Sequence, residues 1–100
     1  MADIQVSELK QRLSELKPPH LIDVREALEY HTFNIGGDNI PLGLLPSRLE
    51  DLELDSNEEI VVICQRGIRS ETAKRILTAA GFRHVRNLIG GLMAWKRQEL

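Results

Sequence analysis

The sequence VVICQRGIRSETAKRILTAAGF, residues 61–82, decides the fold. It continues a β-branched run from Ile60 to Ile63, which is typical of a central strand buried on both faces of a parallel sheet. Beyond a short loop, apolar residues return at helical spacing at Ala73, Ile76, Leu77 and Ala80. Gly81 is a natural stop for that helix. The stretch therefore predicts a strand, a loop and a helix of a parallel α/β sheet.

The flanking sequence repeats this alternation. Further strands are expected at residues 2–6 (ADIQV), 20–24 (HLIDV), 84–89 (HVRNLI) and, briefly, 40–42 (IPL). Further helices are expected on the leucines at 9, 13 and 16 with Ser7 as the cap, over 26–33, near 46–52 and over 92–98. The segments NIGGDN and Gly90-Gly91 are typical of turns. Alternating strands and helices predict an α/β protein.

Length and composition narrow the classes of protein. The 100 residues suit one domain, 1–100, and no Pro/Gly/Ser-rich linker divides them. With 42% hydrophobic and 28% charged residues, disorder, collagen and coiled coil are not expected. A net charge of -2 gives no general attraction for nucleic acid or an anionic membrane. Because neither a membrane span nor a signal peptide is recognisable, a cytoplasmic location is the default expectation.

The loop after the central strand carries the candidate chemistry. Cys64 is the only cysteine, so it is a buried small hydrophobe, an intermolecular link or a reactive thiol. It stands at the carboxyl end of a strand, where open α/β sheets bind ligands. If the loop from Gln65 to Ser70 curls around the sulfur, its N–H groups and the helix N-terminus form an anion nest, and Gly67 supplies the positive φ that this needs.

Such a nest favours the thiolate. A hydrogen bond to a charged group contributes about 1.5–3 kcal/mol, against about 0.3–1 kcal/mol from a helix terminus, so the amides dominate. Arg66 and Arg69 add positive potential for an anionic donor. A lone cysteine at the end of a buried strand is most often inert packing. A glycine and two arginines beside Cys64 have no obvious packing purpose, and they favour the reactive thiol.

At this point the chain resembles the rhodanese homology domain over nearly its whole length. The resemblance runs through LIDVREALEY (residues 21–30), NIGGDNIP (34–41), the stretch 61–82 and VRNLIGGLMAW (85–95). It implies a doubly wound, mostly parallel sheet of about five strands with helices on both faces, and sulfurtransferase activity without metal or cofactor. By this analogy Cys64 is the nucleophile that takes the outer sulfur of thiosulfate or another persulfide donor, and then yields it to cyanide or a thiol.

The resemblance also implies roles for individual positions. Residues 64–69 match the six-residue loop of the family, with Arg66 placed to meet the donor. The family's Gly-His-Ile-Pro-Gly-Ala region is here 33–38, FNIGGD, and is one residue short. Because Asn34 replaces the histidine, no proton-transfer role is assigned there. Asp23 and Arg25 also match the family: Arg25 is expected to pair with Glu29 one helical turn away, and Asp23 to orient the active loop or Arg25.

Other functions and partners stay open. One alternative is a non-enzymatic binding or regulatory module on the same fold. A phosphatase or arsenate reductase on the related fold resembles Cys, five residues, then Arg, but here that position is Ser70 and Arg69 comes one place early. Besides small sulfur anions and thiols, a protein could serve as sulfur donor or acceptor. The remaining candidates are expected on the surface or in the core rather than at a metal site: His20, His31, His84, Met93, Trp95 and the acidic stretch 50–59.

Overall fold

The sheet has four parallel strands. A computed structural model describes residues 1–98, in which the strands are β1 His20–Asp23, β2 Asp38–Asn39, β3 Glu59–Ile63 and β4 His84–Asn87. They lie in the order β2-β1-β3-β4. The expected strand at residues 2–6 is reduced to a single parallel bridge between Ile4 and Leu88. The sheet expected to have about five strands thus has four, with this bridge beyond β4.

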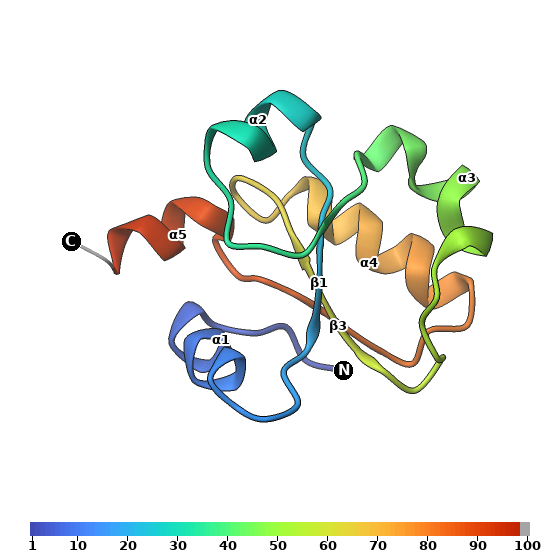
Figure 1. The fold of residues 1–100 in the computed structure, drawn as a ribbon, viewed down its shortest axis with the longest axis horizontal. Helices are drawn as coiled ribbons and strands as arrows, with labels where there is room; N and C mark the ends of the chain where they lie inside the picture. The colour runs from blue at the N-terminus through green and yellow to red at the C-terminus, as the bar shows by residue number, and fades with distance from the viewer. Residues whose placement is uncertain (99–100) are drawn as a thin grey trace.

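Helices cover both faces of this sheet. They are α1 Val6–Leu13, α2 Ala27–Thr32, α3 Leu45–Arg48, α4 Arg69–Ala79 and α5 Gly91–Arg97, with 3₁₀ turns η1 Leu42–Leu44 and η2 Leu49–Asp51 on either side of α3. Figure 1 shows α1 and α5 on one side of the central strands, α3 and α4 on the other, and α2 beyond one end. The α/β class and the helices on both faces are confirmed. Among residues 1–98, no helix has the length and apolar character needed to cross a membrane.

Two apolar clusters fill the space between sheet and helices. Successive side chains of a strand point to opposite faces, so β3 supplies Ile60, Val62 and then Cys64 to one cluster, and Val61 and Ile63 to the other. Helices α4 and α3 add Ala73, Leu77 and Leu45 to the first cluster. Helices α1 and α5 add residues to the second cluster: Val6, Leu9, Leu92 and Trp95. The β-branched run is buried on both faces, as its sequence predicts.

The strand order places a switch point beside β3. From β1 the chain moves outward to β2, then crosses back to form β3 on the other side of β1. The connections that leave β1 and β3 therefore run in opposite directions, and ligands of open α/β sheets bind outside the carboxyl ends of two such strands. Asp23 ends β1 and Cys64 follows β3 at this edge. The fold thus places the candidate cysteine where ligands of such sheets bind.

Three local expectations are wrong. Gln5, not Ser7, precedes the first helix, because the buried Val6 already belongs to it. That helix ends at Leu13, and Leu16 lies outside it with its side chain in solvent. The extended segment IPL is not a strand: β2 lies just before it, and Leu42 already begins a 3₁₀ turn.

Candidate active site

Main-chain donors converge on the sulfur of Cys64. The N–H groups of Gly67 and Ser70 donate to its Sγ, with N···S distances of 3.0 and 3.4 Å. Gly67 has φ +91°, the left-handed conformation that lets the loop turn back toward the sulfur. The Ser70 hydroxyl oxygen lies 3.2 Å from the same atom. Cys64 is only 1% exposed, so its sulfur meets these donors in a nearly water-free setting.

The loop shifts the acidity of this thiol. Burial by itself raises the pKa of Cys64, because it disfavours the charged form. Hydrogen bonds from Ser70 and from the backbone of Arg66 and Gly67 act in the opposite direction and outweigh burial, so that the pKa lies below its ordinary value. The surroundings of the sulfur therefore favour a thiolate.

The start of α5 holds the loop in this orientation. The N–H groups of Leu92 and Met93 donate to the carbonyl oxygens of Cys64 and Gln65, each at 3.0 Å. In a trans peptide the C=O and the next N–H point in opposite directions, so anchoring the Gln65 carbonyl turns the Arg66 N–H toward the sulfur. Gly91 allows the approach: a Cβ there would lie 2.4 Å from the Cys64 carbonyl oxygen. The Gly-Gly turn is thus a support of the loop.

Asn87, at the end of β4, supports the loop through its side chain, and sequence reasoning missed this residue. Its Nδ2 donates to the Gly67 carbonyl at 2.9 Å, and its Oδ1 accepts from the Ser70 hydroxyl. Its backbone N–H is fixed in turn by the Asp3 carboxylate at 3.0 Å, which also binds Lys74. A signal was available in its position: Asn87, like Asp23, is a polar residue at the carboxyl end of a strand, the edge at which open α/β sheets bind ligands.

The expected ion pair between Arg25 and Glu29 is wrong. Arg25 binds the Asp23 carboxylate instead, through Nε at 3.0 Å and Nη2 at 2.8 Å, and both residues are buried. The same guanidinium donates to the carbonyl of Glu29 within α2 and to that of Phe33, which follows the helix. Of the two alternatives for Asp23, the structure brings it to Arg25. This pair joins β1 to α2.

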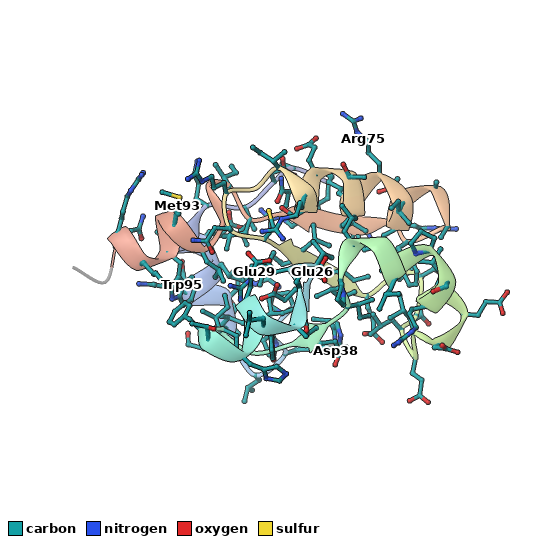
Figure 2. All side chains as sticks on the ribbon, turned by 90° about the horizontal axis from the view of Figure 1, so that it is seen from above. Glu26, Glu29, Asp38, Arg75, Met93 and Trp95 are labelled. Carbon is teal, nitrogen blue, oxygen red and sulfur yellow. The ribbon has the colours of Figure 1, made fainter. Side chains whose placement is uncertain are left out.

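Glu29 pairs with Arg69, in the loop that follows Cys64, rather than with Arg25. Its two carboxylate oxygens accept from Nη1 and Nη2 of Arg69 at 2.7 and 2.9 Å. This hydrogen bonding lowers the pKa of Glu29 from 4.5 to about 2. In Figure 2 Glu29 lies on the side of α2 that faces α4. Glu29 thus balances the charge of Arg69. The other arginine of the loop, Arg66, is exposed, and so is Ile68, which has 74% of its surface in solvent.

The altered segment after α2 closes a turn. Asn34 is exposed; its Nδ2 donates to the Tyr30 carbonyl and its Oδ1 accepts from the Gly36 N–H. It lies outside the cluster of groups around Cys64. Gly37 packs so closely on Leu21 that a Cβ there would come within 2.5 Å of it. The segment thus shapes the connection from α2 to β2.

His20 and Trp95 have partners of their own. His20 pairs with Asp38 at 2.8 Å on the surface. Trp95 belongs to the core, with Lys10 stacked over its ring at 4.9 Å. Met93 is half-buried, and Figure 2 shows it and Trp95 on opposite sides of α5.

Comparison with known proteins gives one consistent family. Residues 5–98 match the model of the rhodanese-like domain. A sulfurtransferase of Allochromatium vinosum is 32% identical over 99 residues, which are 98% of this chain and 91% of that protein. The human single-domain sulfurtransferase TSTD1 has a similar structure, with a TM-score of 0.86 at 26% identity, covering 98% of this chain and 97% of that one.

Some relatives are longer. YrkF of Bacillus subtilis, named as a candidate sulfur carrier protein, is 37% identical over 94 residues, which are 93% of this chain but 50% of that protein. The chain spans 22% and 21% of two adenylyltransferase and sulfurtransferase proteins of Zea mays, MOCS3-1 and MOCS3-2. In these proteins the matching region is one part of a larger whole.

Proposed function

This chain belongs to the rhodanese-like domain family, and we propose that it is a sulfurtransferase or sulfur carrier in which Cys64 carries the transferred sulfur as a persulfide. The observation that carries this proposal is the pair of N–H groups, from Gly67 and Ser70, that point at the Cys64 sulfur. Such donors stabilise negative charge on a sulfur atom, which both the attacking thiolate and a persulfide bear.

The proposed transfer needs no oxidant. The Cys64 thiolate attacks the outer sulfur of thiosulfate; a new S–S bond forms to Cys64 while the S–S bond of the donor breaks, and sulfite leaves with the bonding electron pair. Cyanide or a thiolate then attacks the outer sulfur of the persulfide. That step releases thiocyanate or a new persulfide and returns the Cys64 thiolate. Another persulfide, small or on a protein, can replace thiosulfate as the donor by the same displacement.

The surrounding residues have distinct proposed parts. The amides of Arg66, Gly67 and Ser70 hold the charge on the sulfur, and the exposed side chain of Arg66 attracts an anionic donor. Arg69 braces the loop through Glu29. Asp23 and Arg25 act at a distance, because they fix α2, which carries Glu29.

Two measurements separate this proposal from its alternatives. After incubation with thiosulfate, intact mass spectrometry of the denatured protein should show a gain of one sulfur atom, and Cys64→Ser should show none. An equal gain in Cys64→Ser would remove the assignment of Cys64, and no gain in the native chain would favour a binding module. Turnover of para-nitrophenyl phosphate faster than thiosulfate sulfurtransfer would favour a phosphatase.

A further inference from the structure

The Ser70 hydroxyl has one proton and two neighbours that can accept it. Its oxygen lies 3.2 Å from the sulfur of Cys64 and within hydrogen-bond distance of Oδ1 of Asn87. All three residues are buried, so water is not at hand to relieve an unmatched group. The direction of this proton therefore matters for the charge that the sulfur can hold.

The amide of Asn87 has only one consistent orientation. Its Nδ2 faces the Gly67 carbonyl oxygen at 2.9 Å and the Glu71 carboxylate at 3.3 Å. Both are acceptors, so the amide nitrogen must face them and Oδ1 must face Ser70. Oδ1 carries no hydrogen, so Ser70 is the donor in this contact. Toward the sulfur, Ser70 then presents a lone pair, which suits an S–H group and not a thiolate.

We propose that Asn87 is a positioning residue that competes with the sulfur of Cys64 for the Ser70 hydroxyl proton. In the thiol form, S–H donates to Ser70 and Ser70 donates to Asn87. When the thiol proton leaves to solvent, the hydroxyl must turn from Asn87 to the sulfur, and Oδ1 loses its donor. Asn87 thus limits how readily the thiolate forms. This inference rests on the proposed role of Cys64 as the reactive thiol.

The charged groups around the sulfur do not change when Ser70 or Asn87 is replaced by alanine. Arg66 and Arg69 belong to the loop, and Arg69 is paired with Glu29 of α2. The other elements contribute the pairs Asp3–Lys74 and Arg25–Asp23, and Glu71 beside Asn87. Neutral substitutions at Ser70 and Asn87 remove none of these charges.

The test is a double-mutant cycle on the pKa of Cys64. The pKa is measured from thiolate absorbance, which reports one site because the chain has one cysteine, in the native protein, Ser70→Ala, Asn87→Ala and the double variant. Losing Asn87 also frees the Gly67 carbonyl and loosens the loop. This effect on the pKa is present with Ser70 and with Ala at position 70, so it cancels in the difference between the two backgrounds. We expect Asn87→Ala to favour ionisation about fivefold more when Ser70 is present than in the Ser70→Ala background. No coupling, or coupling of the opposite sign, would overturn the proposal.

A second measurement needs no substitution of Asn87. In nuclear magnetic resonance spectra, the side-chain amide signals of Asn87 should shift along the Cys64 titration in the native protein, and much less in Ser70→Ala. Signals unaffected by that titration in the native protein would overturn the proposal. Sulfur loading is read separately by intact mass. Normal loading with no coupling refutes the competition alone, and coupling without loading refutes the proposed function alone.

Discussion

The two ends of this sheet treat polar groups in opposite ways. At the carboxyl end, donors from Gly67 and Ser70 converge on one sulfur atom that can become charged. At the amino end, charges pair with one another: Glu59 accepts from Arg12 and Arg86. A surface depression lies at the amino end, where Arg12, His20 and Glu59 are among the residues that line it. A surface depression lined by charged residues is therefore not enough to identify a reactive site. Hydrogen-bond donors directed at a nucleophile, as around Cys64, are the better indication.

The amino end shows what mutual pairing does. Burial raises the pKa of Glu59, but hydrogen bonds from Arg12 and Arg86 outweigh it and leave the pKa lowered. Arg86 also binds Glu8, and Arg12 also binds Glu15. Every charge in this network has an opposite partner, so it stabilises the fold without presenting a reactive group.

The largest expected effect separates a fully buried ion pair from a partly buried one. Arg25→Gln leaves the Asp23 carboxylate buried without its partner and frees the carbonyls of Glu29 and Phe33, so we expect the free energy of unfolding to fall by about 3–5 kcal/mol. Arg12→Gln, at the amino end, leaves Glu59 with Arg86 and should cost about 1 kcal/mol or less. Urea denaturation of both variants measures the difference. Equal losses would contradict the contrast between the two ends.

Next in size is the close contact between α5 and the loop. Gly91→Ala places a Cβ 2.4 Å from the Cys64 carbonyl oxygen, and we expect a loss of about 3 kcal/mol together with a raised pKa of Cys64. Gly36→Ala is the matched control: it also has positive φ, +98°, but open space around it, so it should cost about 1–2 kcal/mol and leave the thiol unchanged. Equal losses of stability and equal pKa values of Cys64 in the two variants would mean that the positive φ alone, and not the close contact with Cys64, requires glycine at position 91.

The smallest expected effect is the pH dependence of the bridge over the loop. The pKa of Glu29 is about 2 in the folded protein, below its ordinary 4.5, so its contribution is present above pH 4.5 and is lost as the pH falls toward 2. Because Glu29 and Arg69 are 36% and 38% exposed, we expect only about 0.5–1 kcal/mol. The difference in unfolding free energy between native protein and Glu29→Gln should shrink on acidification. A difference that does not change with pH would refute the bridge.

Much of the fold followed from local sequence patterns. The run Ile60 to Ile63 identified the central strand because burial on both faces requires continuous apolar residues, and the spacing after Ser70 identified α4. The segment 2–6 shows the limit: Ile4 and Val6 are buried, but only Ile4 bridges to Leu88 before the helix begins. Sequence pattern records which residues are buried better than it records how far a strand extends.

The site was less visible because its contacts join distant parts of the chain. The position of Cys64 and the turn at Gly67 follow from one short loop. Glu29 and Arg69 are 40 residues apart, and the Leu92 and Met93 amides that orient the loop come from another helix. Helical spacing predicted a pair between Arg25 and Glu29, because the two are one turn apart. In the structure Arg25 instead binds the buried Asp23 carboxylate. Spacing along the sequence does not reveal such competition.

The pKa of Cys64 in the native protein tests the central claim most directly. Thiolate absorbance, followed from acid to alkaline pH beside a free cysteine peptide, reports it without any donor or acceptor. If the hydrogen bonds from the Ser70 side chain and from the main chain of the loop together outweigh burial, the protein thiol ionises at a lower pH than the peptide. A thiol that ionises at the same pH as the peptide, or above it, would contradict the account.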